Sequence, residues 1–378
     1  MNEYKISILA LLFTIIFFGL IDYTLSNTSN LFDVKKNCFK HTALNYLDKT
    51  YYHYSLSKNC FAIEKKGVSK SYSVFIDRDG FRVKNFDYKK APTEKILFLG
   101  DSFTYGFGVN YEDSIPGLIE SKTDNRYDII NFGVPGYSPL INLYNLKNFL
   151  TNKPESKISK VFYILDLTDP HDESNRWQKV SNFEQPVLKI NNVIEEIEPS
   201  FFKKNFRASR YLSYLINKFI RNLKYEIKNF NLKNEVDNSQ SRKSFWASFT
   251  YTNMSQLKED KDYNNLWIND LDYGLKNIEE NLIEISKILK KYNSEFFIVI
   301  HPWKETIFYG QEAFNWEDFS AKLCEKTQCK KLINLFPDIK NESIENKNWA
   351  TKFYFINDIH FNIFGNKVYA EKIYREAF

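Results

Sequence analysis

Short apolar runs alternate with amphipathic stretches along the chain from about residue 93 onward. The runs cover 96–100, 127–133, 160–167, 295–301 and 331–336. They do not alternate strictly between apolar and polar residues, which is typical of strands buried on both faces. Helical periodicity lies between them, as over 140–150, 273–292 and 364–377. The pattern predicts an α/β fold in which helices cover both faces of a parallel sheet.

Two regions depart from this pattern. Residues 26–92 are polar and aromatic with weak periodicity, except that 71–77 alternates like a strand and ends in the turn sequence RDGF. Residues 174–262 are polar and rich in asparagine, with one amphipathic helical pattern from Leu212 to Ile227 that has basic flanks. That helix either packs on the main domain or contacts an anionic membrane or glycan surface. We expect an N-terminal segment over 26–92 and a main domain over 93–378, with a helical insertion at about 174–262.

The first 25 residues contain a charge-free apolar run from Ile6 to Ile21. At about 1.5 Å per residue, a helix of this length falls slightly short of a hydrocarbon core of ~30 Å. Lys5 and Tyr23 suit the two membrane interfaces, and no A-x-A cleavage site follows. An uncleaved transmembrane anchor is the favoured interpretation, a cleaved signal peptide is the second, and a buried core helix is the third. Either of the first two would export the rest of the chain.

Charge and cysteine content narrow the class of protein. The net charge of +5 over 378 residues is mild and does not favour nucleic-acid binding. The four cysteines form two local pairs, Cys38 with Cys60 and Cys324 with Cys329, and neither pair has a spacing typical of zinc sites. Two disulfides formed in an oxidising compartment are the favoured interpretation, and four separate buried thiols are the alternative. With the N-terminal run, this predicts a bacterial-type inner-membrane protein whose main domain faces the periplasm.

Ser102 is the candidate nucleophile, in the stretch GDSFTYGFGV that directly follows an apolar run. A serine hydroxyl needs a base within hydrogen-bond reach. The five histidines are His41, His53, His171, His301 and His360. Catalytic groups of open parallel sheets gather at the carboxyl ends of the strands, which favours the last three. His360 alone has a carboxylate two residues earlier, Asp358, which could orient its ring.

Three blocks of sequence resemble the SGNH (GDSL-type) hydrolases. They are GDSFTYGFG, NFGVPGYS and, near the C-terminus, NDIHFNIFGNKVYAEKI. The resemblance covers the main domain apart from the insertion, and it implies a three-layer α/β/α sandwich with a five-stranded parallel sheet. It implies Ser102 as nucleophile, His360 as base and Asp358 as the acid. The backbone N–H groups of Ser102 and Gly136 would then form the oxyanion hole.

The chain departs from the family pattern in two places. The common last block spaces acid and base as D-x-x-H, which would use Asn357, whereas this chain has D-x-H. The D-x-H variant also occurs in SGNH-like enzymes of cell-envelope polysaccharide acetylation. The third block usually holds an Asn-Asp pair, and the matching residues here are Thr168 and Asp169. The Thr168 hydroxyl is therefore the candidate third oxyanion donor, with a shorter reach than an asparagine amide.

Acidic residues cluster around the third block, but we expect no metal site. The cluster comprises Asp166, Asp169, Asp172 and Glu173. On a strand-to-loop segment these carboxylates would not converge as a calcium loop arranges them, so we predict a solvated or ion-paired loop. Asp101 is expected to cap the helix that Ser102 begins.

These observations predict an exported serine acyl-ester enzyme without a cofactor. It would be an acetylesterase or an O-acetyltransferase that acts on an acylated envelope or surface glycan through an acyl-enzyme. The alternative is an SGNH-fold glycan-binding or assembly protein with little or no catalysis, which the missing asparagine and the large insertion favour.

Overall fold

The computed structural model describes most of the main domain and the segment before it. The described residues are 13–14, 16–24, 37–47, 49–65, 71–87, 94–124, 126–189, 216, 247–252, 270–356 and 358–378. Most of the predicted basic helix of the insertion lies outside them, as do residues 6–12 and 15 of the N-terminal apolar run. Within the described ranges, no helix has the length and apolar character needed to cross a membrane.

One sheet of eight strands forms the centre of the molecule, in the order β12-β11-β8-β6-β7-β5-β4-β3. Five strands are parallel: β6 (Lys95–Leu99), β7 (Asp128–Asn131), β8 (Ile158–Leu165), β11 (Glu295–Ile300) and β12 (Lys331–Asn334). Three antiparallel strands extend the β7 edge: β3 (Cys60–Glu64), β4 (Tyr72–Ile76) and β5 (Arg82–Val83). The five predicted strands are thus confirmed, but the prediction of a five-stranded sheet is wrong. Of the three additional strands, β4 matches the alternating pattern predicted over 71–77, whereas β3 and β5 come from the weakly patterned sequence around it.

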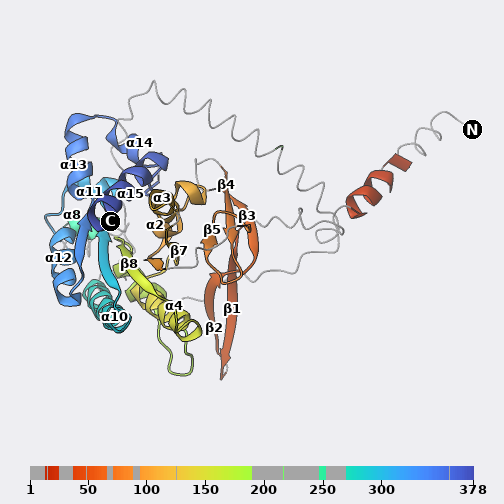
Figure 1. Ribbon diagram of the computed structural model, residues 1–378, viewed down its shortest axis with the longest axis horizontal. Helices are drawn as coiled ribbons and strands as arrows, with labels where there is room; N and C mark the ends of the chain where they lie inside the picture. Colours follow the sequence, from red (N-terminus) through yellow and green to blue (C-terminus); the bar gives the residue numbers. More distant parts are fainter. Residues whose placement is uncertain are drawn as a thin grey trace, which may run out of the picture.

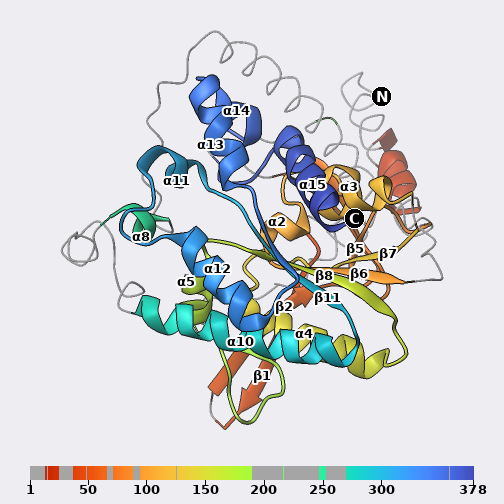
Figure 2. The same ribbon diagram turned by 60° about the vertical axis from the view of Figure 1, so that its left-hand side comes forward.

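Helices cover both faces of the sheet (Figure 2). On one face lie α4 (Pro139–Asn152), α10 (Leu271–Lys291) and α12 (Trp316–Thr327). On the other lie α3 (Ile115–Lys122) and α15 (Ile363–Ala377), which pack against each other. Between the layers, Phe98, Phe162 and Phe297 stack across β6, β8 and β11 with ring centroids 4.9 Å apart. The continuous apolar runs of these strands reflect this burial on both faces.

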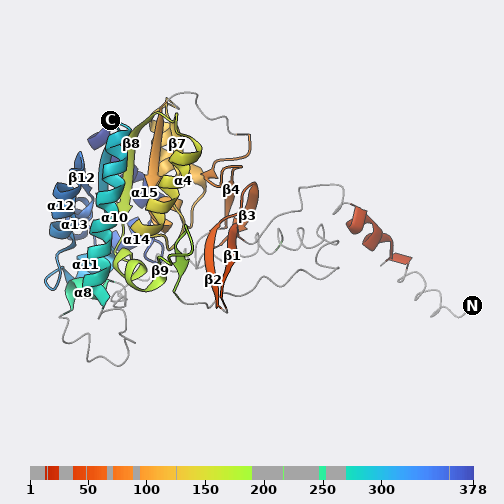
Figure 3. The same cartoon turned by 90° about the horizontal axis from the view of Figure 1, so that it is seen from below.

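A separate hairpin of β1 (Phe39–Tyr46) and β2 (Lys49–Leu56) stands beside β3, β4 and α4 (Figures 1 and 3). The Cys38–Cys60 disulfide joins its first strand to β3, with Cα atoms 5.8 Å apart. The second predicted disulfide, Cys324–Cys329, closes the end of α12. Both predicted pairs are therefore confirmed.

A second aromatic core lies between this hairpin and the main sheet. Tyr54 of β2 packs against Tyr137 and against Trp177, with ring centroids 5.6 and 5.0 Å away. Trp177 begins β9 (Trp177–Gln178), which pairs with β10 (Val187–Leu188). This core fixes the loop that runs from β7 into α4.

Candidate active site

Ser102 is the first residue of a short helix, α2 (Ser102–Tyr105), that follows β6 directly. Gly100 makes the turn with φ +144°, and a Cβ there would lie 2.3 Å from Thr104 Oγ1 and 2.8 Å from the Ile164 carbonyl oxygen. Only glycine fits this position. Asp101 caps the helix as predicted, because its carboxylate accepts a hydrogen bond of 2.9 Å from the Phe103 backbone N–H. The serine is thereby presented at the carboxyl edge of the parallel sheet.

Ser102, His360 and Asp358 form one hydrogen-bonded chain. The Ser102 Oγ lies 2.7 Å from His360 Nε2, although the two residues are 258 positions apart in sequence. His360 Nδ1 lies 2.5 Å from Asp358 Oδ1, and the same oxygen accepts a bond of 3.0 Å from the His360 backbone N–H. The predicted convergence of the three residues is confirmed. The arrangement leaves Nε2 facing the hydroxyl and ties Nδ1 to a carboxylate.

Two phenylalanines hold the imidazole from its sides. The His360 ring is 4.8 Å from the Phe103 ring and 5.2 Å from the Phe107 ring, centroid to centroid. His360 itself is 4% exposed. Its orientation is therefore set by packing as well as by hydrogen bonds.

The other four histidines have different surroundings. His301 is buried beside the Asp166 carboxylate at 3.3 Å, with the Phe103 ring between it and His360. His171 contacts Asp172 at 3.0 Å. His53 Nδ1 donates a hydrogen bond of 2.9 Å to the Pro186 carbonyl oxygen. His41 lies in β1, outside the main sheet.

The loop that carries Gly136 is fixed through its carbonyl groups. Gly136 has φ +75°, and its carbonyl accepts a bond of 2.8 Å from Trp177 Nε1. The carbonyl of Pro135 accepts a bond of 2.7 Å from the Tyr54 hydroxyl. Both donors belong to the aromatic core beside the site. The loop follows β7, the neighbour of the serine-bearing strand β6, as the oxyanion prediction requires.

Thr168 does not serve as the third oxyanion donor in this structure. Its hydroxyl donates to Asp166 Oδ1 at 2.5 Å, and its backbone N–H donates to the same oxygen at 2.9 Å. A hydroxyl has a single hydrogen to donate, and here the Asp166 carboxylate takes it. The prediction for Thr168 is corrected accordingly.

Arg176 lies where sequence analysis placed no functional residue. A Cβ on Gly136 would lie 1.9 Å from Arg176 Nη1, so the guanidinium packs directly on the glycine backbone. Arg176 Nε pairs with Asp172 Oδ1 at 2.8 Å, and this carboxylate raises the pKa of the guanidinium above its usual range. Nothing in the sequence DESNRW marks this arginine. A turn of π-helix at Asp172–Arg176 brings it to the Gly136 loop.

The acidic cluster is not a solvated loop, since its four residues are each 1% exposed, whereas the ion-paired alternative holds for Asp172, which pairs with Arg176. Asp166 also accepts a bond of 2.8 Å from Trp303 Nε1. Burial is the largest influence on the Asp166 pKa and acts to raise it, but the neighbouring His301 ring together with the hydroxyl and backbone N–H of Thr168 outweighs burial, so the pKa is lowered. Burial raises the pKa of Asp169 well above its usual range. Among the described residues, no group of three or more acidic, histidine or cysteine side chains could hold a metal ion.

Glu173 lies below the start of α4. Its carboxylate accepts hydrogen bonds from the Leu140 backbone N–H at 2.6 Å and from Asn281 Nδ2 at 3.2 Å. Burial raises its pKa to about 7. Glu173 thus links α4 to α10 behind the site.

Comparisons with known proteins found similarity in structure alone. No protein-family model and no curated protein matches the chain. The chain is similar to the solved structure of TesA at 10% identity and TM-score 0.39, covering 75% of this chain and 97% of that one. For a member of the lipolytic G-D-S-L family from Veillonella parvula, the identity is 12% and the TM-score 0.38, over 76% of this chain and 98% of that one. For Axe2, an acetylxylan esterase from Geobacillus stearothermophilus, the identity is 12% and the TM-score 0.37, over 77% of this chain and 97% of that one. At these values the similarity decides neither the reaction nor the substrate.

Proposed function

We propose that the protein is a serine acyl-ester enzyme. The observation that carries the proposal is the chain of hydrogen bonds from Ser102 Oγ through His360 to Asp358. Ser102 Oγ attacks the ester carbonyl while its proton passes to His360 Nε2. The alcohol then leaves with that proton, and the acyl group stays on Ser102 as an ester. A second alcohol or water, deprotonated by His360, attacks the acyl-enzyme and restores the serine.

Asp358 positions the imidazole for both steps. Its contact with Nδ1 keeps the proton on that nitrogen, so Nε2 is free to accept the serine proton. The D-x-H spacing lets one carboxylate oxygen bind both the ring and the backbone of His360. A separate partner for the histidine backbone is therefore unnecessary.

The oxyanion would be bound by the backbone N–H groups of Ser102 and Gly136, with the Arg176 guanidinium as the third donor. Three features support Arg176 in this role. It packs on Gly136, its Nε is held by Asp172, and the Thr168 hydroxyl is already bonded to Asp166. A cationic donor is suited to the negative charge that develops on the carbonyl oxygen.

An acylated envelope or surface glycan is the proposed substrate. The D-x-H block, which resembles that of envelope polysaccharide acetylation enzymes, supports this class. With water as acceptor the enzyme is an acetylesterase, and with a sugar hydroxyl it is an O-acetyltransferase. Export behind an uncleaved N-terminal anchor is part of the proposal. It is tested by intact mass and cell fractionation, and a mature chain that begins near residue 27 would contradict the anchor.

A glycan-binding or assembly protein with little catalysis is the second candidate. The absence of the family's asparagine amide at Thr168 favours it, because one lost oxyanion donor lowers a rate by about 10²–10³.

One experiment separates the two candidates. One sample of the full chain is incubated with a serine-directed fluorophosphonate, with S102A as control. A second, unlabelled sample is incubated with an acetyl donor in the presence and absence of an oligosaccharide acceptor. Labelling of Ser102 and turnover of the donor support the enzyme. An unlabelled Ser102 in folded protein contradicts it.

A further inference from the structure

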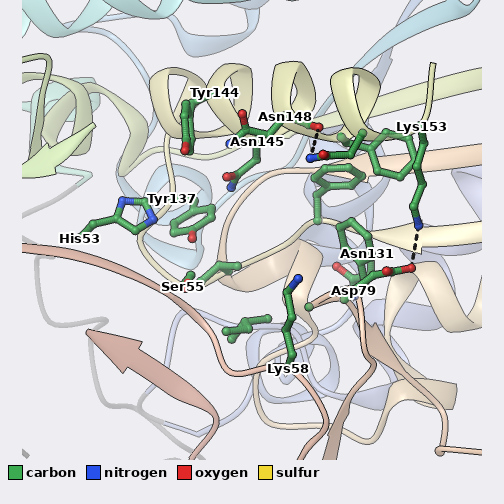
Figure 4. Close-up of a pocket in the computed structure, with 17 residues that line it drawn as sticks. His53, Ser55, Lys58, Asp79, Asn131, Tyr137, Tyr144, Asn145, Asn148 and Lys153 are labelled. Carbon is green, nitrogen blue, oxygen red and sulfur yellow. Dashed lines mark hydrogen bonds and ion pairs between the residues drawn. The ribbon is translucent and has the colours of Figure 1, made fainter. Parts of the chain in front are cut away.

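A groove of about 470 Å³ lies apart from Ser102, between α4 and the β1–β2 hairpin (Figure 4). None of the three residues of the proposed catalytic chain lines it. Side chains from one face of α4 form its roof, and residues of β2 and of the turn after it form the opposite wall. The loop that carries Gly136 also contributes Val134 and Tyr137 to its lining. The groove therefore shares one loop with the proposed active site.

Amide groups dominate the polar lining. Asn145, Asn148 and Asn152 lie at the groove on successive turns of α4, and Asn131 comes from the end of β7. A side-chain amide has two donor hydrogens and one acceptor oxygen, and of this row Asn152 already gives one donor to the Asn148 carbonyl at 2.8 Å. From Tyr144 to Lys153 this row spans about 13 Å along the helix axis. An extended ligand with repeated hydroxyl groups matches such a row better than a compact one.

Asn131 provides an independent sign of a ligand. The residue is 1% exposed, and its Oδ1 accepts a bond of 2.8 Å from the Gly133 backbone N–H. Its Nδ2 has no hydrogen-bond partner among the described residues. A buried donor without an acceptor costs about 1–3 kcal/mol, so such groups usually serve a purpose. An oxygen atom of a ligand seated in the groove would satisfy it.

Aromatic rings provide apolar surface next to the amides. Tyr137, Tyr144, Phe81 and Phe149 all line the groove. Tyr144 is half-buried and packs edge-on to His53 with centroids 6.3 Å apart. Rings beside amides suit sugars, because a sugar has apolar C–H faces and polar hydroxyl edges.

The side chains that line the groove carry a net charge of one positive group. Lys153 is neutralised by Asp79 at 2.6 Å, and burial lowers the pKa of His53, which keeps its ring uncharged at neutral pH. Lys58 points its ammonium group toward α4, and no ion pair within the described ranges involves it (Figure 4). A carboxylate on a sugar ring would pair with Lys58.

We propose that this groove binds an oligosaccharide that carries an acidic sugar. The site would hold a glycan chain at a distance from the ester under attack. This proposal rests on the proposed function in one respect: the glycan bound in the groove would be the one that carries the acyl group. Binding to the groove is independent of the chemistry at Ser102.

The test is binding of the full-length S102A protein to an array of neutral and uronate-containing oligosaccharides, followed by calorimetry with the best ligand. We expect the best ligands to carry a carboxylate. N148A and Y144A should each raise the Kd about tenfold, which corresponds to the loss of about one hydrogen bond or one ring contact. K58A should raise the Kd for the acidic ligand and leave that for its carboxyl-reduced form unchanged. K147A, which removes an exposed lysine of the same helix outside the groove, is the matched control.

Three outcomes would overturn the proposal. They are no binding to any oligosaccharide, binding that N148A and Y144A leave intact, and binding of peptides in place of glycans. Hydrolysis of an aryl acetate by the wild-type chain is measured in parallel. Aryl acetate turnover without glycan binding contradicts the groove alone, whereas glycan binding without turnover contradicts the enzyme alone.

Discussion

Arg82 Nη1 donates a hydrogen bond of 2.7 Å to the carbonyl oxygen of Gly106, four residues after the candidate nucleophile. The same guanidinium donates to the carbonyls of Tyr105 and Val109, and it lies 4.7 Å from the centre of the Tyr105 ring. Arg82 belongs to β5, in the antiparallel extension of the sheet. The segment upstream of the main domain thus holds the turn that follows α2, the short helix that Ser102 begins.

We expect R82M to lower the free energy of unfolding by about 3 kcal/mol or more. The side chain is 1% exposed, and its loss leaves three buried carbonyl groups without their donor. Urea denaturation followed by circular dichroism measures the change. R78M removes an exposed arginine from the preceding turn and serves as the control. An R82M protein as stable as R78M would show that the bonds to the turn contribute little.

The same residue shows why the parallel strands were predictable from the sequence, whereas of the extension only β4, which matches the alternating pattern over 71–77, was. Each parallel strand is buried on both faces, so it appears as a continuous apolar run whatever its neighbours are. β5 has two residues, and one of them is an arginine. A charged residue in a two-residue strand has no hydrophobic pattern, and its burial depends on carbonyl groups that only the folded turn brings together.

The candidate site was predictable to the same extent. The proton transfer requires a serine, a base and an orienting carboxylate, and those residue types in that spacing indicate Ser102, His360 and Asp358. The proton transfer does not require an arginine, so the chemistry gave no reason to select Arg176. Its place beside Gly136 depends on the π-helix after Thr168, which no periodicity in the sequence predicts.

The contact between Asp358 and His360 gives a kinetic prediction. D358N should lower kcat for an aryl acetate by about 10³–10⁴, because an amide in place of the carboxylate favours the wrong imidazole tautomer. Steady-state kinetics measure this, and KM should change little. D338N removes a surface carboxylate that pairs with Lys372, and it should behave as the wild type. A loss below tenfold in D358N would mean that another group orients the ring.

Opposite results are expected from replacing Arg176 and Thr168, the two candidates for the third oxyanion donor. R176A should lower kcat by about 10² with KM nearly unchanged, since the interaction with the carbonyl oxygen strengthens in the transition state. T168V should reduce stability by about 1 kcal/mol, because Asp166 loses a hydrogen bond, while kcat stays within threefold of the wild type. A large fall in kcat for T168V with none for R176A would reverse the assignment.

Glu173 should make stability depend on pH in the weakly acidic range. Its pKa rises from the usual 4.5 to about 7 on burial, so the folded chain binds one more proton than the unfolded chain between these values. The contribution of Glu173 to stability is fully present below pH 4.5 and is lost as the pH rises toward and past 7.

The rise in the Glu173 pKa corresponds to about 3 kcal/mol of stability. E173Q has no titrating group, its amide oxygen can accept from the Leu140 N–H, and its amide nitrogen can donate to the Asn281 oxygen once that amide turns over, so it should gain about this much relative to the wild type between pH 4.5 and 8. Urea unfolding of both proteins at several pH values measures the difference. E342Q, which replaces a half-buried carboxylate whose pKa is lowered by its hydrogen bond with Lys352, should show no such gain. A constant difference between E173Q and the wild type across this range would show that Glu173 is already ionised in the folded protein at pH 5, and that Asn281 and the Leu140 N–H stabilise its charge despite burial.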